Sequence, residues 1–327
     1  MQKIFYVLLI TLISYPLMAQ HKTVGQVISL DPAFNALVDT DAKIEVLADG
    51  FQWTEGPVWV KDGNYLLFSD VKQNTIFKWK EGEGITPFLK PSGYTGRLPY
   101  SDEPGSNGLI INKKGELVAC EHGDRRVSAM PLNNGGKRTL ADNYQGKPFN
   151  SPNDIVQKSN GDYYFTDPAY GLPANAPRNV LGVYGISKDK TVTLLIDDLT
   201  PNGLAFSPDE KILYVAQSLP GSAIIMAYPV KPDGALAKGK IFFDATSMVK
   251  QGLQGLPDGL KTDIHGNIFA TGPGGVLVLS ATGKLLGRID TQQPTANCAW
   301  GDDGSTLYIT ANMLLCRIRT KTKGAQF

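Results

Sequence analysis

The apolar positions of this chain fall into short runs that recur along its length. Six times, a residue with an oxygen-bearing side chain precedes Gly or Asp (once Cys), an apolar pair or triplet, a turn and a β-rich run. Successive opening residues lie 52, 46, 49, 56 and 39 positions apart; they are Glu55, Asn107, Asn153, Asn202, Asp258 and Asn297. Repeats of about 40–50 residues made of short strands are typical of β-propeller blades. We therefore predict an all-β, six-bladed β-propeller.

Each repeat contains a turn that separates a short apolar first strand from a second strand. The turns carry the Gly, Asn, Asp and Pro signals of β-hairpins, at 61–64, 113–115, 159–161, 207–210, 263–266 and 301–304. The last repeat ends near Arg319 after three strands. We expect the segment 43–47 to supply its fourth strand, which would close the ring and remove a free sheet edge.

Hairpin geometry predicts which residues share one face of the propeller. The start of the first strand and the end of the second lie at the same end of a hairpin. The opening residues are therefore expected on one face together with Glu121, His122 and Tyr170. Two connections, 91–106 and 168–182, belong to the same face and are long enough to form a lid.

Four of the opening residues form a set of hard oxygen donors. Glu55 and Asp258 offer carboxylates, and Asn153 and Asn202 offer amide oxygens. Such a set suits a divalent cation, Ca²⁺ first, with Mg²⁺ and Mn²⁺ open and Zn²⁺ less suited because it favours nitrogen and sulfur. The alternative is that residues such as Asn202, in a Pro-Asn-Gly sequence, only form turns. Six equivalent positions in register favour a central metal site.

The first residues have the pattern of a secretory signal. Lys3 supplies the positive start, 4–13 the apolar run and 17–19 a cleavage site. An N-terminal membrane anchor is the alternative. We expect a signal peptide at 1–19, a tail at 20–30 and the propeller at 31–327. The mature protein is then secreted or periplasmic and free of the membrane.

Charge and cysteine content exclude two further classes. The net charge of +1 becomes zero when Lys3 leaves with the signal, so no basic surface for nucleic acid is indicated. Cys298 and Cys316 are expected on the first and third strands of one blade, roughly 10 Å apart and beyond the reach of a disulfide. With Cys120 they should be buried thiols.

Seven segments form a set that matches one known family. They are FQWTEGPVW (51–59), EPGSNGL (103–109), CEHGDRRV (120–127), SPND (151–154), YFTDPAYG (164–171), PNGLAFSPD (201–209) and LPDG (256–259). Together they resemble the SMP-30/gluconolactonase/luciferin-regenerating-enzyme-like family, in particular its secreted bacterial gluconolactonase branch. The likeness runs from about residue 31 to about residue 319.

This resemblance implies a six-bladed propeller with one divalent metal in its channel and a sugar lactone as substrate. It implies metal ligands at Glu55, Asn202 and Asp258, with Asn153 a ligand or a near neighbour. It also implies a proton-transfer role for Asp258.

The residues suggest a hydrolytic mechanism. The cation would polarise the lactone carbonyl while a base takes a proton from water and returns it to the ring oxygen. Asp258, Asp154 and His122 are candidate bases. Asp258 is favoured by the resemblance, but a cation depresses the pKa of a bound carboxylate, so His122 stays a candidate.

Substrate contacts are expected from five residues: Asn107, Glu121, Asp154, Tyr170 and Asn297. Side chains alternate along a strand, so only one of Glu121 and His122 should face the substrate. Two other functions stay open. One is an esterase or phosphotriesterase activity on the same metal, and the other is a propeller that binds a ligand without turnover.

Overall fold

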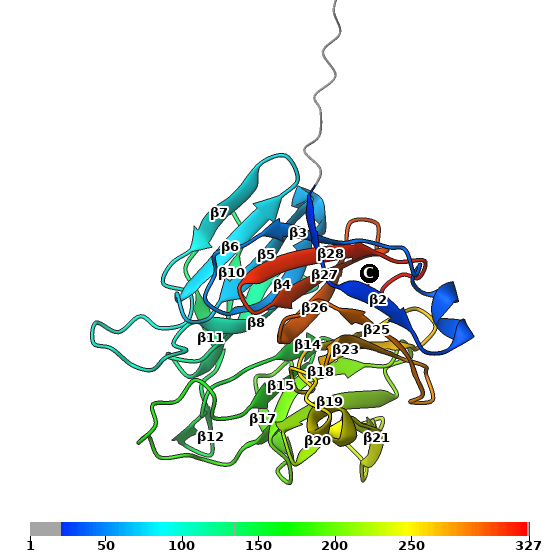
Figure 1. The fold of residues 1–327 in the computed structure, drawn as a ribbon. Coiled ribbons are helices and arrows are strands. Elements are labelled where there is room, and N and C mark those ends of the chain that lie inside the picture. Colours follow the sequence, from blue (N-terminus) through cyan, green and yellow to red (C-terminus); the bar gives the residue numbers. More distant parts are fainter. Residues whose placement is uncertain (1–20, 134, 326) are drawn as a thin grey trace, which may run out of the picture.

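A computed structural model describes residues 21–133, 135–325 and 327. Its antiparallel sheets are arranged around a central channel, which confirms the six-bladed, all-β propeller (Figure 1). The predicted signal peptide, 1–19, lies outside the described residues.

Each blade contains four strands in meander order. Blade one contains β4 (Thr54–Val60), β5 (Tyr65–Asp70), β6 (Thr75–Lys80) and β7 (Gly84–Leu89). Blade two contains β8 (Ser106–Ile111), β9 (Glu116–Glu121), β10 (Arg126–Pro131) and β11 (Arg138–Ala141). Blade three contains β14 (Ile155–Gln157), β15 (Tyr163–Asp167), β16 (Gly182–Ile186) and β17 (Val192–Ile196). Blade four contains β18 (Pro201–Phe206), β19 (Ile212–Leu219), β20 (Ser222–Pro229) and β21 (Lys240–Asp244). Blade five contains β22 (Leu260–Thr262), β23 (Ile268–Gly272), β24 (Gly275–Leu279) and β25 (Leu285–Asp290).

The sixth blade joins the two ends of the propeller. It contains β26 (Thr295–Gly301), β27 (Thr306–Ala311), β28 (Leu314–Arg319) and β3 (Ile44–Ala48). Figure 1 shows β28, in red, beside β3, in blue, and the register pairs Cys316 with Val46. The predicted closure by the segment 43–47 is therefore confirmed. Arg317 strengthens it through an ion pair with Glu45, at 2.7 Å.

The segment 20–30, which we expected to be a tail, contributes strands instead. β1 (Lys22–Val24) pairs with β3, and β2 (Gln26–Ser29) pairs with β25. These strands cover the outer edges of blades six and five, so the segment is part of the sheet structure. The remaining elements are small: a hairpin of β12 (Asn143–Tyr144) and β13 (Lys147–Pro148), two 3-10 turns at Pro32–Ala36 and Lys61–Gly63, and α1 (Thr246–Lys250).

The hydrophobic core lies between neighbouring blades. Tyr164 and Val183 of blade three, for example, pack in one buried cluster with Leu204, Phe206 and Val215 of blade four. The three cysteines are free and buried in these layers, as expected. Cys298 and Cys316 both pair with Ile309 and therefore lie on the first and third strands of one blade.

Glycines of the repeat allow the inner strands to converge. A Cβ on Gly203 would lie 2.3 Å from the Asp258 backbone oxygen, and one on Gly259 would lie 2.0 Å from Asn297 Cγ. Similarly, a Cβ on Gly108 would lie 2.7 Å from the Asn153 backbone oxygen, which accepts the Gly108 N–H at 2.7 Å. The glycine of each of these pairs therefore brings the next opening residue close.

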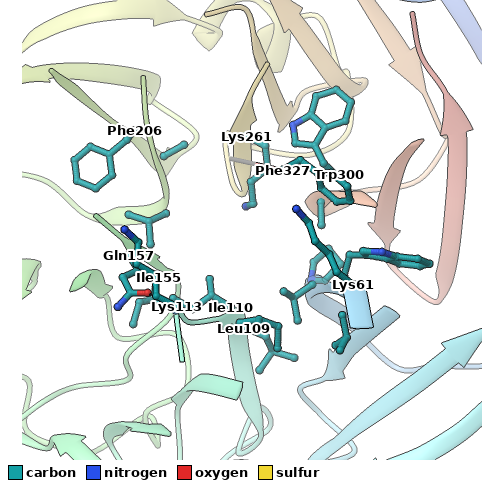
Figure 2. A pocket seen from close by; sticks show the side chains of 18 of the residues that line it. Lys61, Leu109, Ile110, Lys113, Ile155, Gln157, Phe206, Lys261, Trp300 and Phe327 are labelled. Atoms are coloured by element: carbon teal, nitrogen blue, oxygen red, sulfur yellow. Dashed lines mark hydrogen bonds between the residues drawn. The ribbon is translucent and has the colours of Figure 1, made fainter. Parts of the chain in front are cut away.

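The channel has two distinct ends. The opening residues define one end, here called the channel mouth. Further along the inner strands lies a chamber of about 690 Å³, here called the lower chamber. Apolar side chains such as Leu109, Ile155 and Phe206 line this chamber, and the Lys61 and Lys261 ammonium groups point into it (Figure 2). No helix within the described part of the chain is long and apolar enough to span a membrane.

Candidate active site

The six opening residues all lie at the channel mouth. Glu55, Asn107, Asn202 and Asn297 are near the starts of inner strands, whereas Asn153 and Asp258 lie two residues before β14 and β22. Five are at most 5 % exposed, and Asp258 is partly exposed. The inner-strand convergence thus gathers oxygen-bearing side chains into a buried ring.

Glu55 has one oxygen held by the protein. Oε2 accepts the Gly56 N–H at 3.0 Å and the Asn297 Nδ2–H at 3.4 Å. Oε1 takes no part in these bonds and is available to a ligand. The contact between Asn297 and Glu55 also joins blade six to blade one at the channel mouth.

Three buried oxygens of the site have no hydrogen-bond partner among the described residues. They are Asn107 Oδ1, Asn202 Oδ1 and Asp154 Oδ2. Buried acceptors without partners cost free energy, so each of them calls for a donor or a cation. Asn297 differs, because its Oδ1 accepts the Cys298 N–H at 2.9 Å and lies 3.4 Å from Lys261 Nζ.

Asn202 is oriented from behind by Ser218. The Asn202 Nδ2–H donates to Ser218 Oγ at 2.9 Å, and the Ser218 hydroxyl donates to the Pro257 backbone oxygen. Because Nδ2 is engaged, Oδ1 is the end of the amide left free. Ser218 is the last residue but one of β19, the second strand of its blade, and sequence reasoning did not select it as a site residue.

Four acidic side chains lie close together at the channel mouth: Glu55, Glu103, Asp154 and Asp258. Burial, together with the neighbouring Asp154 charge, raises the pKa of Glu55 to about 8. Partial burial also raises the pKa of Asp258 well above its usual value, with contributions from Glu55, Asp154 and Glu103. None of these four carboxyls has an ion pair to Lys, Arg or His within the described ranges. The ring therefore holds acidic groups with no protein cation to balance them.

The donor chemistry fits a hard divalent cation. The groups that would hold it are the carboxylates of Glu55 and Asp258 and the amide oxygens of Asn202 and Asn153, all oxygen donors of the kind Ca²⁺ takes. No group of three or more His, Cys, Asp or Glu in the described residues is placed to hold a metal. Amide oxygens are thus needed to complete any site, which disfavours Zn²⁺.

His122 lies behind the ring and is fully buried. Its Nδ1 is 3.1 Å from the Glu103 backbone oxygen, and its Nε2 is 3.4 Å from Asn107 Nδ2. Burial lowers the pKa of His122 to about 4, so the imidazole is neutral near pH 7. The residue we considered as a base is therefore in contact with Asn107.

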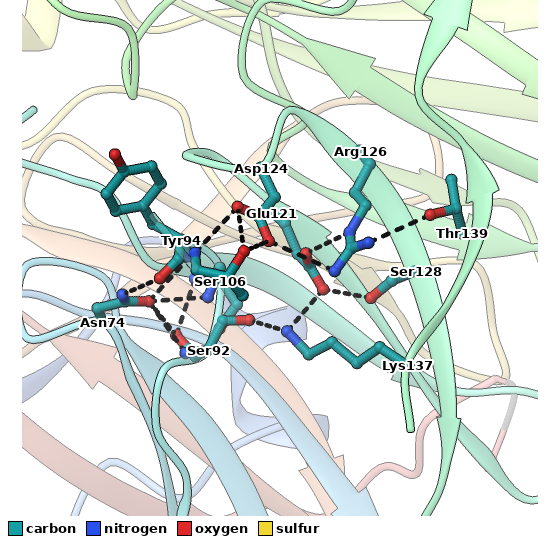
Figure 3. A network of polar contacts seen from close by, with 12 residues as sticks. Asn74, Ser92, Tyr94, Ser106, Glu121, Asp124, Arg126, Ser128, Lys137 and Thr139 are labelled. Atoms are coloured by element: carbon teal, nitrogen blue, oxygen red, sulfur yellow. Dashed lines mark hydrogen bonds and ion pairs between the residues drawn. The ribbon is translucent and has the colours of Figure 1, made fainter. Parts of the chain in front are cut away.

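Glu121 does not face the channel mouth. Its carboxylate forms ion pairs with Arg126 Nε and Lys137 Nζ, both at 2.7 Å, and accepts the Ser128 hydroxyl (Figure 3). We expected Glu121 to contact substrate, but both of its oxygens are engaged in this network. As strand alternation predicts, only one of Glu121 and His122 faces inward, and it is His122.

The same network anchors the connection 91–106. Asn74 Oδ1 accepts the N–H groups of Ser92, Gly93 and Tyr94 at 2.8–3.2 Å (Figure 3). Lys137 adds a bond to the Ser92 backbone oxygen. This connection is therefore held by blade one, through Asn74, and by blade two, through Lys137.

The two long connections each add one residue to the site. Tyr170 lies beside Asp258 and Ser218, and burial with the Asp258 charge raises the pKa of its hydroxyl. Glu103 contributes negative charge near Glu55 and Asp258, and burial raises the pKa of its carboxyl. Sequence reasoning did not select Glu103, although it lies in the segment that leads directly into Asn107.

Fold and site together define a six-bladed propeller with a buried, oxygen-lined site at the channel mouth. The chain belongs to the SMP-30/Gluconolactonase/LRE-like family, whose model matches residues 53–313.

Individual relatives agree with this assignment. A gluconolactonase of Zymomonas mobilis is 41% identical over 320 residues, covering 92% of this chain and 88% of that protein. A solved gluconolactonase of Xanthomonas campestris has a TM-score of 0.81 at 30% identity, covering 92% of this chain and 98% of its own. A regucalcin of Xenopus laevis is 25% identical, with 82% and 86% of the two chains covered.

Proposed function

We propose that this protein is a lactonase that hydrolyses a sugar lactone with the help of a divalent cation. The observation that carries the proposal is the buried ring at the channel mouth, with unbalanced carboxyls and unpartnered oxygens. The similarity to proteins named gluconolactonase supports the reaction class.

Glu55, Asn202 and Asp258, with Asn153, are the residues we propose to hold the cation, Ca²⁺ first. When bound, the cation supplies Lewis-acid polarisation of the lactone carbonyl. Asn297 keeps Glu55 in place through its Nδ2–H, and Ser218 keeps Asn202 in place through its hydroxyl.

Asp258 is proposed to move the proton. Its carboxylate accepts a proton from the attacking water and returns it to the ring oxygen as the ester bond breaks. Asp154 is the second candidate, because its Oδ2 is buried and free while Oδ1 is held by the Ile155 N–H at 2.9 Å. Asn107 Oδ1 and the Tyr170 hydroxyl are proposed to contact substrate hydroxyls at the channel mouth.

The cellular location is proposed from the sequence. We infer that the segment 1–19 directs secretion and is removed, which leaves a protein that is periplasmic or released. Sequencing the N-terminus of the mature protein tests this, and a mature chain that retains the segment would contradict it.

The deciding experiment measures hydrolysis of a panel of aldonolactones by metal-stripped protein, before and after Ca²⁺ is added. We expect turnover that appears only with the cation and is lost in Asp258→Asn. Equal turnover without any cation would overturn the metal requirement. Hydrolysis of simple esters alone, or ligand binding without turnover, would overturn the lactonase assignment.

A further inference from the structure

We infer that His122 is a positioning residue that fixes the Asn107 amide with its oxygen free, and that it is not the base of the reaction. The inference deepens the proposed function, because it concerns the site that would act on the lactone. It is carried by the hydrogen-bond partners of His122.

The tautomer of His122 follows from its first partner. The Glu103 backbone oxygen can only accept a hydrogen bond, so the ring nitrogen 3.1 Å away, Nδ1, carries the proton. In a neutral imidazole the other nitrogen, Nε2, then has a lone pair and acts as an acceptor.

The orientation of Asn107 follows from that tautomer. Nε2 needs a donor, and Asn107 Nδ2 is 3.4 Å away. With Nδ2 bound to the imidazole, the opposite end of the amide is Oδ1, which is buried and has no partner in the described part of the chain. Asn107 itself is only 3 % exposed. The arrangement thus leaves an acceptor ready for a substrate donor.

The same contact removes His122 from proton transfer. The lone pair that a base would use is occupied by the Asn107 amide, and the ring is 0 % exposed. A base must reach the proton it abstracts directly or through one water. His122 reaches Asn107 instead, and Asn107 Oδ1 is the group left for the substrate.

His122 also joins the two long connections. Its Nδ1–H binds the Glu103 backbone oxygen of the connection 91–106, and a Cβ on Gly171 would lie 2.4 Å from the His122 ring and Cβ. Gly171, in the connection 168–182, therefore packs directly against it. The competing explanation is that His122 only anchors these connections. Substitution by Gln or by Asn distinguishes this role from the positioning of Asn107.

Gln and Asn at position 122 each preserve one half of the imidazole. Gln places an acceptor near the position of Nε2 and loses the donor to Glu103. Asn keeps a donor near the position of Nδ1 and loses the acceptor for Asn107. We therefore compare His122→Gln, His122→Asn and His122→Leu for kcat, KM and the pH dependence of kcat/KM on the best aldonolactone of the panel.

We expect His122→Gln to stay within about 3-fold of the wild-type kcat/KM. His122→Asn and His122→Leu should lose about 10- to 100-fold, mainly in KM, with the pH profile unchanged. In an Asn107→Ala background, His122→Leu should cost little more, since the two residues act as one unit. Retained activity in His122→Asn but not in His122→Gln would overturn the inference in favour of anchoring. A loss of 1000-fold or more in kcat for all three, with a lost pH limb, would show that His122 is the base.

Nitrogen NMR of the wild-type protein near pH 7 provides a readout that does not depend on turnover. We expect the neutral Nδ1–H tautomer for His122. The Nε2–H tautomer or a cationic ring would overturn the inference even if the protein is a lactonase. If no lactone is hydrolysed, the proposed function fails, and the tautomer still decides how Asn107 is oriented.

Discussion

A side-chain amide has one accepting and one donating end, and at this channel mouth the residues behind the ring decide which end is free. Ser218 binds the donating end of Asn202, and His122 binds that of Asn107. For Asn297 the opposite holds, because Cys298 and Lys261 engage its oxygen and its Nδ2–H points to Glu55. The three asparagines therefore have different tasks.

Ser218→Ala should weaken cation binding. Without the hydroxyl, the Asn202 amide loses the partner of its Nδ2 and is free to rotate its oxygen out of the site. Loss of such a supporting bond typically costs 10- to 100-fold in metal affinity, and we expect about 10-fold for Ca²⁺ by titration calorimetry. Ser280→Ala, in a turn on the opposite face, is the control. An unchanged affinity in Ser218→Ala would mean that Asn202 does not bind the cation.

The pH dependence of stability should report the neutral state of His122. Its pKa is about 4 in the folded protein and near 6.5 when unfolded, so the unfolded chain binds more protons between these values. The free energy of unfolding therefore falls as pH falls from about 6.5 to 4, by up to about 3 kcal/mol. Urea unfolding should show a smaller acid loss in His122→Gln. Equal losses in both proteins would place the histidine in contact with water.

Much of the site could be predicted residue by residue, because the repeat places equivalent positions in register. Strand alternation predicted that only one of Glu121 and His122 faces inward, but not which one. That choice depends on Arg126 and Lys137, which engage Glu121 from blade two. Glu103 was missed because it lies in a connection and not at a repeated position. Ser218 lies near the end of a second strand, on the predicted face, but a serine there does not stand out in the sequence. Amide orientation is decided entirely by three-dimensional neighbours.

At the scale of elements, the inner strands must approach one another closely at the channel mouth. The glycines after Asn107, Asn202 and Asp258 allow this, since a side chain at any of them would collide with the next blade. The repeated pattern therefore has two physical reasons: the opening residues supply oxygen atoms, and the glycines after them allow the strands to approach closely.

Gly259→Ala should damage the site while Gly221→Ala should not. The new methyl group at 259 would overlap Asn297, which must then move and release Glu55. We expect a loss of hydrolysis of about 10²-fold, as for a displacement of about 1 Å in an active site. At Gly221 no described residue would lie within 4 Å of the new methyl group, and the backbone is unstrained. Equal activity of the two variants would contradict close packing at the ring.

The ring closure was predictable because one repeat lacked a strand. The strands β1 and β2 were not predicted, because three or four residues are too few to display an alternating pattern. Their partners are also remote in sequence, as Val27 pairs with Ile289. Local patterns therefore predict blades, whereas long-range pairing decides how the edges are covered.

For the whole molecule, cation binding should increase stability. A ligand that binds only the folded state adds RT ln(1 + [L]/Kd), about 2.7 kcal/mol at 100 times Kd. The raised pKa values of Glu55 and Asp258 mean that the cation must displace protons near neutral pH, so the gain should grow as pH rises. We expect Ca²⁺ to raise the melting temperature of the wild-type protein and to have little effect on Glu55→Gln. A shift of the same size in both proteins would place the cation elsewhere.

The closure of the ring also sets an order of events during biosynthesis. Val46 pairs with Cys316, which the ribosome adds 270 positions later. At about 5–20 residues per second, the strand waits on the order of 10–50 s for its partner. β1 can cover one edge of β3 early, because the two are close in the chain. The other edge stays open until β28 emerges, so the nascent chain is exposed to wrong pairing at this edge throughout that interval.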